Sequence, residues 1–143
     1  MSGVVVGVDD SETARRALDR AALIAKALGE PLHLVMAVRP GVSRMITKGT
    51  DEFIIDWVTD AEQQLHSIKS KAGVPEATTS VSDQDPATAI CGEAESRGAN
   101  LIVVGNRRMQ GASRVLGAVA SDVLKHAPCD VLVAKTTGAP LES

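Results

Sequence analysis

The chain has 143 residues, of which 44% are hydrophobic and 23% charged, a composition typical of one soluble globular domain. A net charge of −3 and an aromatic content of 1% argue against nucleic-acid binding, which needs a basic surface and aromatic side chains for stacking. Without a leader-like start or an apolar stretch of membrane-spanning length, we expect a cytoplasmic protein with no membrane association, and reduced thiols at Cys91 and Cys129, which lack metal-ligand spacing.

The first half of the chain predicts strands and helices in alternation. Apolar β-branched residues at 4–8 indicate a central strand, and either Asp9 or Ser11 is suited to cap the helix that follows. Apolar residues recur at steps of three and four over 14–28, which predicts one alanine-rich helical face before Gly29 ends the helix. The next predicted elements are a strand at 32–38, a long loop at 39–50 and a helix at 54–68.

The second half continues this alternation. A pattern of alternating polarity at 77–81 indicates an edge strand, exposed on one side. Asp85 as N-cap and Pro86 at the first helical position begin a helix to about Arg97. An unbroken apolar run at 101–104 predicts a strand buried on both faces. The remaining predicted elements are a helix ending at about His126, a strand at 131–134 and a flexible tail at 138–143, leaving one domain over 1–137.

Five strands alternating with four helices predict an α/β fold. The expected architecture is a single doubly wound, Rossmann-like parallel sheet with helices on both faces. In such sheets a ligand binds beyond the carboxyl ends of the strands, where the winding reverses. Two strand ends carry polar chemistry, at 7–11 (GVDDS) and at 105–108 (GNRR). If these strands are neighbours, acidic groups and a basic, glycine-rich loop face one crevice.

The segment after the 101–104 strand has the chemistry of a phosphate site. Its glycines allow close backbone approach, Arg107 and Arg108 carry positive charge, and a helix begins after Gly117 with an N-terminus that favours an anion. Each feature also has an ordinary explanation. The glycines suit turns, the arginines suit a solvated loop surface, and Asp9 and Asp10 suit helix capping.

Several segments resemble the universal stress protein family. They are 5–12 (VVGVDDSE), 85–90 (DPATAI), 101–106 (LIVVGN), 115–118 (VLGA), 126–129 (HAPC) and 131–133 (VLV). The resemblance spans nearly the whole chain and thins between residues 40 and 81. It implies a five-stranded parallel sheet of order 3-2-1-4-5, which places the two polar strand ends side by side.

The resemblance also implies an adenine-nucleotide site, because many members bind ATP. Asp9 would meet the nucleoside, Ala37 would line the adenine, and Gly105, Gly117 and the backbone after it would hold ribose and phosphates. The expected ligand is ATP or another adenine nucleotide such as AMP or cyclic AMP, with Mg²⁺ only alongside the nucleotide. The residues expected at this site are Gly7, Val8, Asp9, Ala37, Val104, Gly105, Arg107, Arg108, Gly117, Ala118 and Val119.

The sequence departs from the ATP-binding pattern of the family, in which glycines recur with spacers of two and nine residues and the last is followed by Ser or Thr. Arg108 stands where the second glycine is expected, the second spacer is one residue short, and Ala118 replaces the hydroxyl residue. Arg107 and Arg108 could nevertheless supply charge-assisted contacts to phosphate. Asp10 adds a negative charge near any triphosphate.

We expect a stress-response or signalling module rather than a dedicated enzyme. Ser11, Ser113 and Ser121 have no evident base partner, and Asp9 and Asp10 are the only candidate groups to orient water at the phosphates. Slow ATP hydrolysis is compatible with this expectation. The three histidines, His33, His66 and His126, are expected to have structural roles.

Two other hypotheses compete with nucleotide binding. In the first, the chain is an interaction protein that binds no ATP and dimerises through its last strand, at Val131, Leu132 and Val133, as family members commonly do. In the second, it is a receiver-like phosphotransfer domain with Asp83 as phosphate acceptor and Lys135 as the cation after the last strand. A homodimer through this last strand is expected for the nucleotide-binding protein as well.

Overall fold

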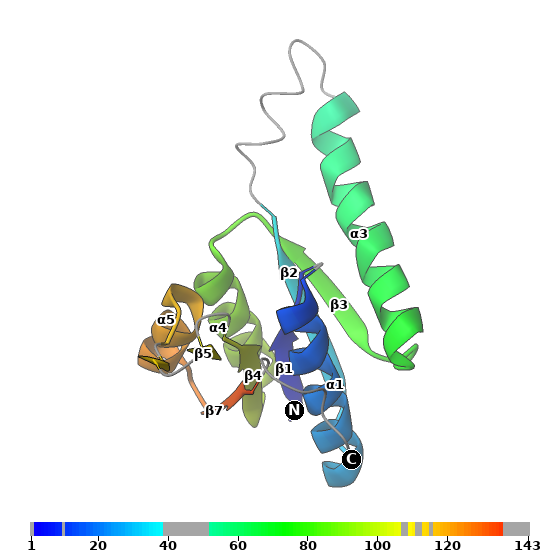
Figure 1. The fold of residues 1–143 in the computed structure, drawn as a ribbon. Coiled ribbons are helices and arrows are strands. Elements are labelled where there is room, and N and C mark those ends of the chain that lie inside the picture. The colour runs from blue at the N-terminus through cyan, green and yellow to red at the C-terminus, as the bar shows by residue number, and fades with distance from the viewer. Residues whose placement is uncertain are drawn as a thin grey trace.

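A parallel β-sheet with helices on both faces forms the body of the protein (Figure 1). The computed structural model describes residues 2–9, 11–38, 52–106, 109–110, 113–114 and 116–135. The helices are α1 (Glu12–Leu28), α3 (Glu52–Ala72), α4 (Pro86–Arg97) and α5 (Ala118–His126). The strands are β1 (Val4–Gly7), β2 (Leu32–Ala37), β3 (Thr78–Ser82), β4 (Leu101–Gly105), β5 (Met109–Gln110), β6 (Ser113–Arg114) and β7 (Asp130–Ala134).

The main sheet has the order β3-β2-β1-β4-β7, and its neighbouring strands are all parallel. The central strand β1 pairs with β2 on one side and with β4 on the other, so that Val4 lies level with both Leu32 and Leu101. The chain winds from β1 outward to β3 and then returns to wind through β4 to β7. This reversal confirms the predicted doubly wound fold and its strand order.

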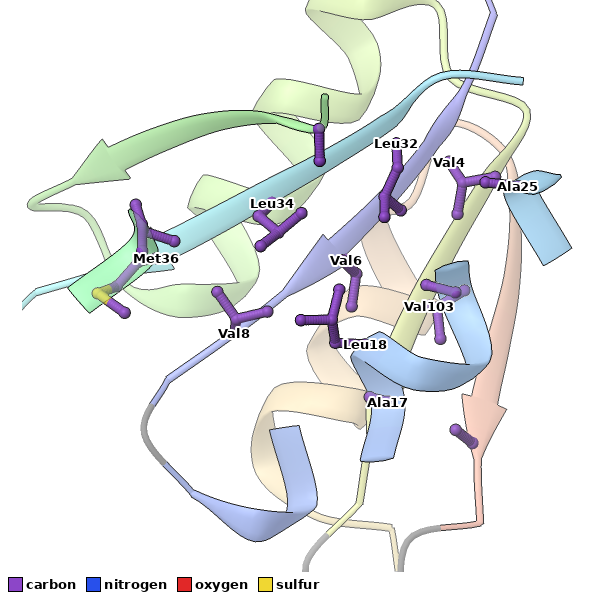
Figure 2. Packing of buried hydrophobic residues seen from close by; sticks show 14 of the residues in the cluster. Val4, Val6, Val8, Ala17, Leu18, Ala25, Leu32, Leu34, Met36 and Val103 are labelled. Atoms are coloured by element: carbon purple, nitrogen blue, oxygen red, sulfur yellow. The ribbon is translucent and has the colours of Figure 1, made fainter. Parts of the chain in front are cut away.

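Two cores sandwich the sheet because side chains alternate along each strand. Val4, Val6 and Val8 pack with α1 and α3, whereas Val5 packs with α4 and α5. Figure 2 shows Val6 and Val8 beside Leu18 of α1. Alanines at 17 and 21 are fully buried and bring α1 close to the sheet, as the alanine-rich face predicts.

Local chemistry sets the helix ends. Ser11 caps α1, because its Oγ accepts a hydrogen bond from the Ala14 amide at 3.1 Å, while Asp9 Oδ1 accepts from the Ser11 amide at 2.8 Å. The choice that the sequence leaves between Asp9 and Ser11 is thus settled for Ser11. Asp85 caps α4 with Pro86 in its first turn, as predicted, and Gly29 ends α1 in the left-handed conformation that favours glycine.

The structure differs from the prediction between β4 and α5. The sequence predicts only a loop there, whereas β5 and β6 pair as a short antiparallel hairpin. Two residues separate these strands, Gly111 and Ala112, and such a spacing with a glycine is a hairpin signal. The strand β7 also begins one residue earlier than predicted, at Asp130. The predicted loop at 39–50 and the predicted tail at 138–143 lie outside the described residues.

A buried histidine joins β2, β3 and α4. His33 is 3% exposed, and its Nε2 lies 2.7 Å from Ser80 Oγ and 3.1 Å from Glu93 Oε1. A carboxylate only accepts hydrogen bonds, so Nε2 carries the proton and Nδ1 accepts from the Thr78 hydroxyl. Arg97 Nε in turn donates to Glu93 Oε1 at 3.1 Å. Burial, and next the positive charge of Arg97, lower the pKa of His33 from 6.5 to about 4.

This lowered pKa predicts a pH-dependent stability. Between pH 6.5 and about 4 the unfolded chain binds a proton at His33 that the folded chain does not, so the contribution of His33 to stability falls as the pH is lowered and reaches its limit below that window. The full effect is about 3 kcal/mol in the free energy of unfolding. Urea unfolding at a series of pH values measures it. His33→Gln should flatten the dependence, whereas His66→Gln, on the exposed side of α3, should keep it; equal slopes in both variants would refute the assignment.

Candidate functional site

A cavity of about 350 Å³ opens beyond the carboxyl ends of β1 and β4. This volume is within the range of small-molecule sites. The winding of the sheet reverses between these two strands, which is where doubly wound proteins bind their ligands. Strands β1, β2 and β4 form its base, and α1, α4 and α5 contribute its sides.

All predicted site residues that the structure describes line this cavity. They are Gly7, Val8, Asp9, Ala37, Val104, Gly105, Gly117, Ala118 and Val119. The predicted residues Arg107 and Arg108, and Asp10 beside Asp9, lie outside the described residues. The sequence predicts that the two polar strand ends face one crevice if their strands are neighbours. The structure shows that the strands are neighbours and that residues of both ends line one cavity.

The cavity also has walls that the sequence did not predict. Pro86 and Ile90 of α4 contribute one side, and Val35 of β2 and Asn106 after β4 contribute others. Asn106 belongs to the polar strand end at 105–108 that the sequence places at the crevice, but it was not among the expected site residues. Pro86 and Ile90 could not be predicted, since their place depends on where α4 crosses the sheet.

Glycine at position 7 makes room for one of these walls. A Cβ atom built there would lie 2.5 Å from Ile90 Cδ1, closer than packed carbon atoms approach. Ile90 is 4% exposed and holds its position against the sheet. Gly7 thus lets an apolar α4 side chain close over the end of β1.

Asn106 holds the start of α5 against the end of β4. Its side chain is buried, and its Oδ1 accepts a hydrogen bond from the Gly117 amide at 2.7 Å. Gly117 is the N-cap of α5, and no side chain caps this helix. The first turn of α5, from Ala118 to Ala120, lines the cavity. A helix N-terminus carries partial positive charge and amide donors, so this side of the cavity favours an anion.

The cavity has mostly apolar and backbone walls with one charged side chain. Asp9 is exposed at the mouth, and among the lining residues described it is the only titratable one. Within the same part of the chain, no cluster of three His, Cys, Asp or Glu side chains is placed to hold a metal ion. The arrangement suits binding of a ligand with an apolar part and an anionic part.

The bond from Asn106 to α5 predicts a local destabilisation. Asn106→Ala removes the acceptor of the Gly117 amide, and the expected cost is about 1–2 kcal/mol in the free energy of unfolding. Hydrogen exchange should quicken at Gly117 and in the first turn of α5. Asn100→Ala, which removes an exposed amide that bonds Glu30, is the control with an expected cost of about 0.5 kcal/mol or less. Equal losses in the two variants would show that Asn106 has no anchoring role.

The strand order argues against a receiver domain. In the receiver order, 2-1-3-4-5, the third strand lies beside the first, so that its terminal Asp joins the acids after the first strand. Here Asp83 follows the edge strand β3, and β2 separates β3 from β1. Asp83 is absent from the lining of the cavity that contains Asp9.

The fold and the cavity together define a doubly wound α/β protein with a crevice at its switch point. Comparison with known proteins gives the family: the family model described as Universal stress protein family matches residues 1–135. The chain belongs to the universal stress protein family. None of the helices in the described ranges is both long and apolar enough to cross a bilayer.

Individual relatives agree with this membership. The chain is 34% identical to universal stress protein Rv2623 of Mycobacterium tuberculosis, an alignment that covers 92% of the chain and 46% of that protein. The chain thus spans about half the length of this relative. Among solved structures, it resembles the universal stress protein from Archaeoglobus fulgidus in complex with dAMP, with 28% identity, a TM-score of 0.65 and coverage of 93% and 97% of the two chains. A universal stress protein in complex with cAMP matches with 28% identity, a TM-score of 0.65 and coverage of 95% and 98%.

Proposed function

We propose that this protein binds an adenine nucleotide in the crevice between β1 and β4. The observation that carries the proposal is the cavity itself, where the N-terminal turn of α5 faces apolar strand ends across one acidic side chain. The two nucleotide complexes of relatives, with dAMP and cAMP, support an adenine nucleotide over other small anions. The protein would act as a cytoplasmic stress-response or signalling module.

The lining residues suggest how the nucleotide lies. Val35 and Ala37 at the end of β2 offer an apolar wall for the base, and Asp9 offers a carboxylate to the ribose hydroxyls or a base amine. The phosphate would meet the amides of Ala118 and Val119, where the α5 N-terminus favours negative charge. Mg²⁺ would enter only with the nucleotide.

The same residues also indicate how many phosphates the preferred nucleotide carries. Ala118 has no hydroxyl to donate to a phosphate oxygen, and the described lining has no Lys or Arg. By sequence, Arg107 and Arg108 follow Gly105 and Asn106 and could supply the missing charge. AMP and cyclic AMP need fewer donors than ATP, so we expect them to bind at least as well as ATP.

We propose binding without dedicated catalysis. General acid–base chemistry needs a group within hydrogen-bond reach of the transferred proton, with a suitable pKa. Asp9 is the one titratable side chain of the described lining, and its Oδ1 accepts the Ser11 amide. Slow hydrolysis of bound ATP would be compatible with this site.

Calorimetry with AMP, cyclic AMP and ATP tests the proposal. Asp9→Ala should weaken AMP binding by about tenfold through loss of a charged hydrogen-bond acceptor. Asp83→Ala removes an exposed acid outside the cavity and should leave the affinity unchanged. Ala118→Ser should raise the affinity for ATP relative to AMP several-fold, because it restores a donor to phosphate. No heat with any of the three nucleotides at about 1 mM would leave the interaction-protein hypothesis in its place.

We also propose a homodimer formed through β7. This strand is an edge of the sheet, and Val131, Leu132 and Val133 on it are only half-buried. An apolar edge strand with unpaired backbone groups is a ready surface for pairing with a second copy.

Light scattering coupled to size-exclusion chromatography tests the dimer. Val131→Asp should convert the dimer to a monomer by placing a charge at the paired edge. Thr79→Asp introduces the same charge on the opposite edge strand, β3, and should leave the dimer intact. A monomer in the unmodified protein, or a dimer insensitive to Val131→Asp, would contradict this assembly.

A further inference from the structure

A second cavity lies between α1 and α3, on the face of the sheet opposite α4. Its volume is about 300 Å³. From α1 it is lined by Glu12, Arg15 and Leu18, and from α3 by Gln64, Ser67, Ile68 and Lys71. The spacings along each helix place these side chains on one stripe, so two stripes face each other across the seam.

The composition of this seam is unusual for two helices packed side by side on a sheet. Such helices normally interdigitate apolar side chains and leave almost no space. Here the base of the cavity is apolar, with Leu18 fully buried and Val8 6% exposed, while polar and charged side chains surround the opening. Outside the packed core of Leu18, Ala61 and Leu65, the two helices therefore leave a groove with an apolar base and a polar rim.

Charges of both signs surround the opening. Asp9 and Glu12 are acidic, and Arg15 and Lys71 are basic. Arg15 pairs with Asp19 at 3.7 Å and Glu12 with Arg16 at 3.5 Å, both within α1. Each pair has at least one well-exposed carboxylate, so solvent weakens both pairs, although the Arg16 side chain is only 19% exposed. For Lys71, the structure shows no ion pair among the residues it describes.

We propose that the α1–α3 cavity binds a small zwitterion with an apolar body, of the size of a free aliphatic amino acid. The carboxylate would meet Lys71 and Arg15, the ammonium would meet Asp9 and Glu12, and the aliphatic part would cover Val8, Leu18 and Ile68. A volume of about 300 Å³ accepts such a molecule.

The two cavities share a wall. Val8, Asp9, Ser11 and Ala14 line both of them. The Ser11 amide donates to Asp9 Oδ1 at 2.8 Å and the Ala14 amide donates to Ser11 Oγ at 3.1 Å, so hydrogen bonds connect Asp9, Ser11 and Ala14 within this wall. A ligand that shifts Asp9 from one side changes the surface that the other ligand meets, so the two sites are linked. This linkage rests on the proposed nucleotide function, whereas binding in the α1–α3 cavity does not.

An NMR titration with L-leucine in the absence of nucleotide tests the site. Saturable amide shifts are expected at Arg15, Leu18, Ser67 and Lys71. Two further probes each lack one charge: 4-methylpentanoate has no ammonium and 3-methylbutylamine no carboxylate, and each should bind about tenfold more weakly than leucine. Equal binding of the three probes, or no saturation below roughly 10 mM leucine, would overturn the proposal.

Matched variants locate the site on α3. Lys71→Ala should weaken leucine binding by about fivefold to tenfold, whereas Lys69→Ala, two residues away and outside the lining, should leave it unchanged. Ser67→Leu should abolish binding by filling the hollow while keeping the protein folded, as judged by its thermal unfolding. Equal effects of the two lysine variants would overturn the assignment.

Repeating the AMP calorimetry with saturating leucine tests the linkage. A change of threefold or more in the AMP affinity, matched by the same change in leucine affinity with AMP present, is expected from reciprocal coupling of about this size. Leucine binding without any AMP binding would remove only the nucleotide proposal. An AMP affinity independent of leucine would remove only the coupling.

Discussion

The structure depends on a central strand buried on both of its faces. Val4, Val5 and Val6 of β1 are at most 1% exposed, so each face of this strand must be covered by a helical layer. Only apolar side chains of moderate size fit there, and the near absence of aromatic residues elsewhere lets alanine-rich helices come close. The chain winds from β1 toward β2 on one side and later returns to β4 on the other side. The crevice opens at the carboxyl ends of β1 and β4, where this reversal of winding occurs.

Local patterns in the sequence predict the elements well because their causes are local. The capping residues Ser11 and Asp85 and the stop at Gly29 act within one helical turn, and the strand at 101–104 is recognised from its own apolar run. The order of the strands cannot be predicted in the same way, since the periodicity of a segment does not indicate which strands are its neighbours. It followed from the resemblance to a family, and the pairing of β1 with both β2 and β4 confirms it.

The features that were missed depend on contacts between distant segments. Ile90 enters the crevice because α4 crosses the sheet beside Gly7, a relation that neither segment shows alone. His33 was expected to be structural, but its partners Ser80 and Glu93 come from β3 and α4. The hairpin of β5 and β6 is an exception, since Gly111 between two short segments was a readable local signal.

The anchoring of α5 has a consequence for how such a crevice changes in evolution or design. Asn106 ties the helix to the end of β4 from inside the core, and β4 and α5 are each packed into the body of the domain. The residues between Asn106 and Gly117 therefore join two points whose separation is set without them. Substitutions in that connecting segment should therefore leave the base of the crevice in place, because the Asn106 bond ties α5 to β4 independently of the segment.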